Sequence, residues 1–281
     1  MDNMIDGVKN KICVITGGAG VIGTSLGIGL AQAGAKVAIV DFNKQRADEV
    51  SNIINEKTNS GSIGVFANVL DKNLLIESKR EINSRLGNID VLINAAGGNS
   101  PSATTKEEFV LESNLDDLSG TLLGLDIEAL RKIFDLNFIG TVLPTIVYVE
   151  DIIKTKGCIV NISSMNAFRP LTKIPAYSAA KASINNLTEW LAVHFAKVNV
   201  RVNAIAPGFF VTDQNRFLLY DKETGKLTAR GERILSNTPM GRFGEPEEIT
   251  GTLLYLISNL SKFVTGIVIP VDGGFNSYSG V

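Results

Sequence analysis

The chain has 281 residues, of which 44% are hydrophobic and 20% are charged, and its formal net charge is −2. This composition supports one large buried core, since an open α/β sheet of this length often forms a single domain. The near-neutral charge argues against a nucleic-acid partner, because proteins that bind polyanions usually carry a basic excess.

The two cysteines, Cys13 and Cys158, lie in short apolar runs that are typical of buried strands. They form no Cys–x–x–Cys or Cys/His cluster, so we expect neither a disulfide framework nor a metal site. The first ten residues carry acids and lack an apolar core, which is not the pattern of a signal peptide. Since no apolar stretch reaches the roughly 20 residues of a membrane span, we expect a cytoplasmic protein without a membrane partner.

Strand-like and helix-like segments alternate along the chain. Strands are predicted at residues 11–16, 36–41, 62–69, 89–94, 157–163, 200–206 and 267–271. Helices are predicted at residues 21–34, 44–57, 73–86, 127–154, 176–197 and 246–258. The strands are continuous β-branched runs, so we expect a sheet that is covered on both faces. The alternation predicts an α/β fold over residues 1–281, a single-domain Rossmann-type doubly wound parallel sheet with right-handed crossovers.

Two long stretches do not fit this alternation, residues 98–126 and residues 208–245. Irregular segments of this length inside a compact domain are usually functional or mobile. We expect the first to be an insert and the second to form a lid over the substrate.

A glycine-rich stretch, Gly17 to Gly23, follows the first predicted strand and opens the first predicted helix. Glycines let the backbone approach a pyrophosphate, and the helix N-terminus supplies unpaired N–H groups; an ordinary strand-to-helix turn is the alternative. Asp41 closes the next strand, where a carboxylate can accept both ribose hydroxyls of an adenosine and repel a 2′-phosphate. This favours NAD over NADP, although Arg46 lies one helical turn later and Asp41 could instead cap a helix.

Tyr177 and Lys181 lie four residues apart at the start of a predicted helix, so the phenol and the ammonium share one face. An unperturbed tyrosine has a pKa of about 10, which is too high for a base at neutral pH. An adjacent ammonium favours the phenolate, so we expect Lys181 to lower the pKa of Tyr177. Ser163 and Ser164 end the preceding strand, and Asn94 ends another, at the edge where open α/β sheets bind ligands. Chance is a poor explanation for this convergence of polar residues on one edge.

Over about residues 8–281 the chain resembles the short-chain dehydrogenase/reductase family. The resemblance rests on the glycine loop, Asp41, the strand end from Asn94 to Gly97, Asn137, Ser164, Tyr177 with Lys181, and Pro207 and Gly208 with Thr212. It implies an NAD(H)-dependent oxidoreductase that interconverts a secondary alcohol and a ketone. The family is typically tetrameric, which implies a homotetramer.

The resemblance also implies a role for each catalytic residue. Tyr177 is then the general acid/base, and Lys181 holds the nicotinamide ribose and lowers the pKa of the tyrosine. Ser164 rather than Ser163 orients the substrate oxygen, and Asn137 supports a proton-relay water near Lys181.

The residues implied to contact the cofactor lie in the glycine loop and at the ends of neighbouring strands. They are Gly17, Gly20, Val21, Ile22, Gly23, Asp41, Asn68, Val69, Asn94, Ala95, Gly97, Tyr177, Lys181, Pro207, Gly208, Val211 and Thr212. Two of them depart from the family pattern, because Val21 stands where a small residue is usual and Asn68 stands where an aspartate is common.

A narrower resemblance is to the mannonate oxidoreductase (fructuronate reductase) branch of the family. It rests on residues 96–101 with the insert after them, residues 161–168, residues 206–216 and residues 272–275. It implies interconversion of D-mannonate and D-fructuronate with NAD(H). A gluconate or other polyol dehydrogenase is the alternative within the class. A non-catalytic NAD(H)-binding sensor and a redox-neutral epimerase or dehydratase are alternatives outside it.

A sugar acid carries a carboxylate, and the planar fork of arginine suits that group best. Arg216 lies in the predicted lid, so we expect it to bind the carboxylate, with Arg169 and Lys173 as competing cations. A surface or interface arginine is the alternative interpretation of Arg216. Asn99 and Asn166 are expected to contact substrate hydroxyls.

Overall fold

The computed structural model describes residues 7–212 and 216–280, and these contain one seven-stranded sheet. Its strands are β1 (Ile12–Thr16), β2 (Lys36–Asp41), β3 (Ile63–Phe66), β4 (Val91–Asn94), β5 (Cys158–Ile162), β6 (Arg201–Pro207) and β7 (Val268–Val271). All neighbouring strands pair in parallel, in the order β3-β2-β1-β4-β5-β6-β7. The chain starts in the middle of the sheet and winds outward in both directions, which confirms the predicted doubly wound fold.

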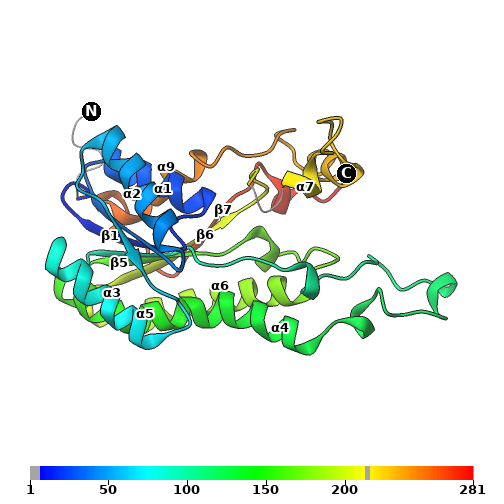
Figure 1. Cartoon of the computed structure of the whole chain (residues 1–281), viewed down its shortest axis with the longest axis horizontal. Helices are drawn as coiled ribbons and strands as arrows, with labels where there is room; N and C mark the ends of the chain where they lie inside the picture. Colours follow the sequence, from blue (N-terminus) through cyan, green and yellow to red (C-terminus); the bar gives the residue numbers. More distant parts are fainter. Residues whose placement is uncertain (1–6, 213–215, 281) are drawn as a thin grey trace.

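Helices cover both faces of the sheet (Figure 1). One layer holds α1 (Val21–Gln32), α2 (Lys44–Thr58) and α9 (Glu248–Ile257), and the other holds α3 (Lys72–Arg85), α5 (Gly140–Thr155) and α6 (Pro175–Phe195). Alternate side chains of each strand enter opposite cores. Cys13 and Ile15 of β1 pack with α1 and α9, whereas Ile12 and Val14 pack with α3 and α5. This two-sided burial explains why the strands are continuous apolar runs.

The helix predicted at residues 127–154 is divided in the structure. α4 (Ile127–Phe134) is followed by a π-helical turn (Asp135–Ile139) and then by α5. Asn137 lies in this turn and is fully buried. Single π-helical turns within helices often occur at functional sites, and this one lies next to the polar edge of the sheet.

Among the described residues, one helical segment is long and apolar enough to cross a membrane by length and composition alone, Ile127–Thr155 with a mean hydropathy of 1.4. The expectation that no stretch reaches this length is therefore wrong for this segment. Half of its most apolar window is buried inside the protein, where it packs against α3, β4 and α6. Packing in the core therefore explains why this segment is apolar.

The two irregular stretches differ from each other. Residues 98–126 contain only short 3₁₀ turns and extend away from the sheet as an arm, drawn in teal and green at the lower right of Figure 1. Residues 208–245 are less irregular than predicted, because they include α7 (Arg216–Leu219) and α8 (Ala229–Ser236). Both helices are too short for a repeating apolar face to be recognised in the sequence.

A buried pair of hydroxyl groups braces α3 against α5. Tyr148 Oη and Ser78 Oγ lie 2.6 Å apart, and both side chains are buried. Burial raises the pKa of Tyr148 to about 12, so this phenol stays protonated at neutral pH.

We expect Tyr148→Phe to lower the free energy of unfolding by about 1–2 kcal/mol, because Ser78 loses a buried partner. Denaturant unfolding measures the change. Tyr255→Phe, at a partly exposed position of α9, is the control and should change the same quantity by no more than about 0.5 kcal/mol. Equal losses in the two variants would contradict the role of the buried bond.

Candidate active site

The polar residues at the strand ends meet at the carboxyl edge of the sheet. Thr16 and Asn94 end neighbouring strands in register, and Thr16 Oγ1 accepts hydrogen bonds from the N–H groups of Ala95 (3.2 Å) and Ala96 (3.4 Å). Asn94 Nδ2 donates to Asn161 Oδ1 of β5 (2.9 Å). These bonds hold the ends of β1, β4 and β5 together beneath the site.

Tyr177 and Lys181 lie on consecutive turns of α6, which begins at Pro175. Lys181 is buried, and its Nζ donates to the carbonyl oxygen of Ile162 at the end of β5 (2.8 Å). The same Nζ lies 5.7 Å from the centre of the Tyr177 ring. The structure therefore brings the phenol and the ammonium together, as their spacing in the sequence suggests.

Of the two serines that follow β5, Ser164 faces the tyrosine. Its side chain lies near enough to the Tyr177 hydroxyl to lower the pKa of that phenol, and its Oγ accepts from the N–H of Asn166 (3.2 Å). Ser163 turns toward α6 instead, where its Oγ donates to Asn185 Oδ1 (2.5 Å). This geometry favours Ser164 as the orienting serine, and the Ser163–Asn185 contact has no recognisable signal in the sequence.

Burial controls the protonation of both central groups. Desolvation raises the pKa of the Tyr177 hydroxyl, against the smaller opposing effect of the nearby Ser164 side chain. Desolvation also lowers the pKa of Lys181 to about 8. The expected lowering of the tyrosine pKa by Lys181 is therefore wrong for the protein on its own, because the loss of water around the hydroxyl has the larger effect.

Asn137 fixes the turn that follows β4. Its Nδ2 donates to the carbonyl oxygens of Gly98 and Ile133, both at 2.8 Å, and its Oδ1 accepts from the N–H of Gly98 (3.2 Å). A Cβ atom at Gly97 would lie 2.6 Å from Asn137 Oδ1 and 3.2 Å from Lys181 Nζ, so glycine fits there best. The amide is thus committed to the backbone, and its support of a relay water stays a prediction.

The glycine loop makes a tight turn and leaves the start of α1 open. Gly17 has a φ of +62°, and a Cβ there would lie 2.6 Å from the Cα of Ala96, so this turn needs glycine. Gly20 precedes α1 without a side-chain cap, and the first turn of the helix carries no acid. Its N–H groups therefore remain available for an anion. The predicted contacts in that turn are Val21, Ile22 and Gly23.

Asp41 ends β2 beside this loop. It is buried, with Oδ2 accepting from the N–H of Ala19 (3.2 Å) and Oδ1 accepting from the N–H of Asn43 (3.0 Å). The alternative that Asp41 caps α2 is wrong, because Asn43 does so by accepting from the N–H of Arg46 (3.1 Å). Arg46 Nη2 donates to the carbonyl oxygen of Ala19 (3.3 Å). The arginine is thus held against the loop, and both Asp41 oxygens keep a lone pair for a ribose.

Asn68 and Val69 follow β3 at the same edge. Asn68 is exposed, and its Oδ1 accepts from the N–H of Leu70 (3.0 Å). Val69 is buried against Gly140, where a Cβ atom would lie 2.9 Å from Val69 Cγ2. The backbone at Val69 is thus fixed in place, with the Asn68 amide exposed beside it.

The segment after β6 leaves the sheet sharply. β6 ends at Pro207, and a Cβ atom at Gly208 would lie 2.6 Å from a backbone Cα just after β7. Val211 packs into a small apolar core formed with α7 and α8, and Thr212 follows it. Residues 213–215, which belong to the motif that suggested a mannonate oxidoreductase, lie outside the described residues.

The three predicted substrate contacts lie at different depths. Asn166 is buried next to Ser164. Asn99 is exposed, and its Nδ2 donates to Thr104 Oγ1 (2.9 Å) at the base of the arm. Arg216 is exposed, with its guanidinium carbon 5.8 Å from the centre of the nearest tyrosine ring. The structure brings Asn166 close to Ser164, and the binding roles of all three residues stay predictions.

The chain matches the family model described as enoyl-(acyl carrier protein) reductase over residues 17–276. It belongs to the short-chain dehydrogenase/reductase family. This short-chain dehydrogenase/reductase is 45% identical over 280 residues to the uncharacterized oxidoreductase UxuB of Bacillus subtilis, covering 98% of each chain. It is 31% identical over 261 residues to the gluconate 5-dehydrogenase of Gluconobacter oxydans, covering 93% of each.

Among solved structures, one from Haemophilus influenzae is 50% identical to this short-chain dehydrogenase/reductase, with 98% of each chain covered and a TM-score of 0.90. That protein is described, provisionally, as a D-mannonate oxidoreductase with bound NAD. The predicted class of oxidoreductase is therefore confirmed.

The burial of Lys181 links stability to pH. The ordinary pKa of a lysine is 10.5, whereas burial lowers the pKa of Lys181 to about 8 in the folded protein. Between these two values the unfolded chain binds the proton and the folded protein does not, so stability rises with pH across this window. Below about pH 8 both states are protonated, and the folded state bears the whole cost of the buried charge.

We expect Lys181→Met to raise the free energy of unfolding by about 1–3 kcal/mol at neutral pH, because the cost of the buried charge exceeds the value of the lost hydrogen bond. This gain should shrink as the pH rises from about 8 toward 10.5. Denaturant unfolding of both proteins across that range measures it. Lys222→Met, at an exposed position, is the control. A gain that is absent, or one that is constant with pH, would contradict the lowered pKa.

Proposed function

We propose that this protein is an NAD(H)-dependent oxidoreductase that interconverts D-mannonate and D-fructuronate, a secondary alcohol and a ketone of a sugar acid. The observation that carries this proposal is the meeting of Tyr177, Ser164 and Lys181 at the sheet edge that also holds the glycine loop. The identity of 50% to the Haemophilus influenzae protein with bound NAD supports the cofactor and the substrate.

The residues at the sheet edge fit a dinucleotide that lies along it. When bound, NAD would supply the hydride acceptor for alcohol oxidation, and NADH would supply the hydride donor for ketone reduction. The open first turn of α1 would bind the pyrophosphate, since a carboxylate or capping side chain is missing from that turn. Asp41 would accept the hydroxyls of the adenosine ribose, and Lys181 would donate to those of the nicotinamide ribose.

Tyr177 would act as the general acid in ketone reduction and as the general base in alcohol oxidation. In ketone reduction its hydroxyl donates a proton to the carbonyl oxygen as that oxygen gains charge, and Ser164 donates a hydrogen bond to the same oxygen. The raised pKa of Tyr177 keeps the hydroxyl protonated at neutral pH, which suits this donation. Lys181, charged below its pKa of about 8, stabilises the phenolate that remains. Alcohol oxidation uses the reverse transfer.

A gluconate or other polyol dehydrogenase is the second candidate, favoured by the identity of 31% to a gluconate 5-dehydrogenase. A panel of aldonates, uronates and neutral polyols, assayed with NAD(H) by the absorbance of reduced nicotinamide, separates the two. The highest kcat/KM on mannonate or fructuronate supports the first candidate, and the highest value on gluconate or a polyol supports the second. Binding of NAD(H) without turnover of any compound would point to a sensor.

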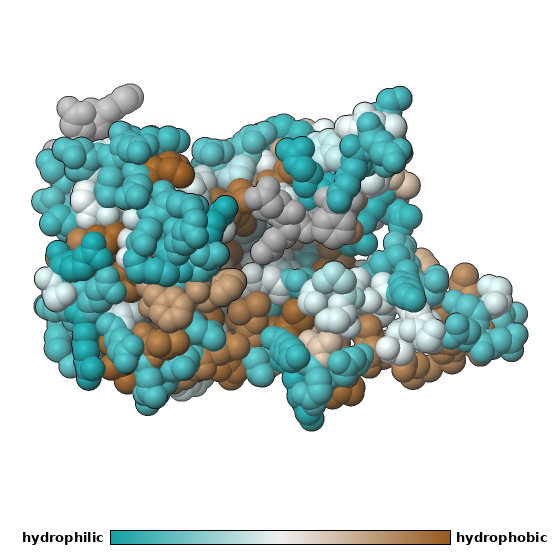
Figure 2. Space-filling view, in the orientation of Figure 1, coloured by the Kyte–Doolittle hydropathy of each residue, from teal (hydrophilic) through white to brown (hydrophobic). Residues whose placement is uncertain are grey.

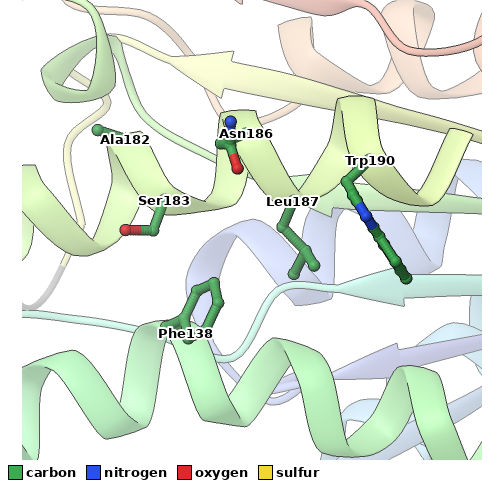
Figure 3. Close-up of a pocket in the computed structure, with 6 residues that line it drawn as sticks. All are labelled: Phe138, Ala182, Ser183, Asn186, Leu187 and Trp190. Carbon is green, nitrogen blue, oxygen red and sulfur yellow. The ribbon is translucent and has the colours of Figure 1, made fainter. Parts of the chain in front are cut away.

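We also propose a homotetramer as the assembly. Apolar side chains are exposed along the underside of the arm (Figure 2), and others lie on the outer side of α6. A depression of about 550 Å³ lies between α6 and the π-helical turn (Figure 3), and it is lined by Phe138, Ala182, Ser183, Asn186, Leu187 and Trp190. Exposed apolar areas often mark contacts between proteins. Sedimentation velocity at micromolar concentration tests the proposal, and a monomer would refute it.

We expect Tyr177→Phe to lower kcat by about 10²–10⁴-fold, which is the usual contribution of general acid–base catalysis. The affinity for NAD should stay close to that of the wild type, because the ring still packs against Ala103 and Ile133. Steady-state kinetics and calorimetric titration with NAD measure the two quantities, with Tyr278→Phe as the control. Retention of more than about a tenth of the wild-type kcat would remove Tyr177 from the acid/base role.

We expect Asp41→Ser to weaken NAD binding by about 1.5–3 kcal/mol, the value of hydrogen bonds to a charged group. The preference for NAD over NADP should narrow, because the carboxylate no longer repels a 2′-phosphate. The ratio of kcat/KM for the two cofactors measures this change, and Asp48→Ser, at a half-exposed side chain of α2, is the control. An unchanged ratio would place the selectivity elsewhere, with Arg46 as the next residue to test.

A further inference from the structure

Several cations lie on the segments that border the substrate side of the molecule. They are Arg169 and Lys173 between Ser164 and Tyr177, and Arg216, Arg230 and Arg233 on α7 and α8. Most of them are exposed or already engaged. Lys173 Nζ donates to the carbonyl oxygen of Lys106 (2.6 Å), and Arg233 pairs with Glu108 (2.7 Å).

Arg230 differs from these cations. It is half-buried, and within residues 7–212 and 216–280 it forms no hydrogen bond or ion pair. Partial burial of a guanidinium without an acid opposite it is unfavourable, because the charge loses water and gains no partner. An unpaired cation of this kind is suited to bind an anion.

The packing of α8 shows which way Arg230 faces. Gly231 and Ile234 are buried, and Ile234 packs in the small apolar core with α7, so they mark the inner face of the helix. Arg233 marks the outer side, where it reaches Glu108 of the arm. At 100° per residue Arg230 lies on the flank between Ile234 and Arg233, so it borders the gap between α8 and the arm.

The arm connects this gap to the catalytic tyrosine. Ala103, at the base of the arm, packs in one apolar cluster with Tyr177. The N–H of Thr105 donates to the carbonyl oxygen of Lys173 (2.9 Å), which ties the arm to the loop before α6. Glu108 then follows within five residues of Ala103. In Figure 2 the surface is hollowed between the arm and the segment above it, so α8 and the arm form opposite walls.

We propose that Arg230 binds the carboxylate of the substrate, and that it is the residue by which the enzyme distinguishes a sugar acid from a neutral polyol. This inference rests on the proposed function and assigns the charge recognition to α8. The planar fork of arginine can donate two parallel hydrogen bonds to a carboxylate. The pair of Arg233 with Glu108 lies where α8 approaches the arm, and Arg230 lies beside it at the same gap.

The test is Arg230→Leu in the full chain, assayed with NAD(H) on the best sugar acid of the panel and on the matching neutral polyol. The value of kcat/KM for the acid should fall by about 10²-fold or more, since a charge-assisted bond is lost. The value for the polyol should change by no more than about fivefold. Arg230→Lys should recover part of the loss, because it restores the charge without the fork. The affinity for NAD and the Tm show that each variant is folded.

Arg233→Leu is the matched control, because it removes one arginine of α8 whose exposed pair with Glu108 contributes little. Arg216→Leu tests the competing cation on α7. A larger change of the acid-to-polyol ratio in Arg216→Leu than in Arg230→Leu would overturn the proposal and assign the carboxylate to Arg216. Equal losses of kcat/KM on both substrates in Arg230→Leu would also overturn it, since Arg230 would then stabilise the structure of α8 without recognising the substrate carboxylate. If the wild type turned over polyols and no sugar acid, the proposed substrate class would fail first, and this inference with it.

Discussion

The buried ammonium of Lys181 is the group on which the arrangement of this site depends. It has a neutral carbonyl as its hydrogen-bond partner, that of Ile162 at the end of β5, and a carbonyl stabilises a buried charge less than a carboxylate does. The lowered pKa of about 8 is the result. The ammonium also limits what can stand beside it, because Gly97 has no room for a side chain between Lys181 and Asn137. The turn after β4, the π-helical turn and the start of α6 are therefore positioned around one charge.

Ser163 gives this arrangement a second point of attachment. It follows Ile162, and its Oγ reaches Asn185 one turn beyond Lys181 on α6. Two hydrogen bonds thus join the end of β5 to α6, one from Lys181 to the carbonyl oxygen of Ile162 and one from Ser163 to Asn185. The adjacent Ser164 is free to face Tyr177 because its neighbour makes the structural contact. Alternation of side chains along extended backbone separates the two roles.

The sequence predicts those parts of the site that depend on local spacing or on the parallel topology. The glycine loop, the spacing of Tyr177 and Lys181, and the polar ends of parallel strands belong to this group, since parallel strands place their carboxyl ends at one edge. The parts that depend on distant packing could not be predicted. The pKa of Tyr177 is raised by burial beside Ala103, which lies far away in the sequence. The π-helical turn likewise depends on bonds from Asn137 to Gly98.

The two halves of the site use different kinds of contact, and this difference bears on how specificity can change. The proposed cofactor half consists of backbone N–H groups and close glycine contacts, such as that of Gly17 with Ala96, so few substitutions there are compatible with the fold. The proposed substrate half consists of side chains on segments outside the sheet. The one ion pair described between the arm and α8, Glu108 with Arg233, has an arginine that is 65% exposed, and exposed pairs contribute only about 0–1 kcal/mol. The arm and α8 can therefore separate at little cost, and their side chains can be substituted without disturbing the sheet. Substitutions in these two segments are thus the ones by which specificity could change from one sugar acid to another at the lowest cost in stability.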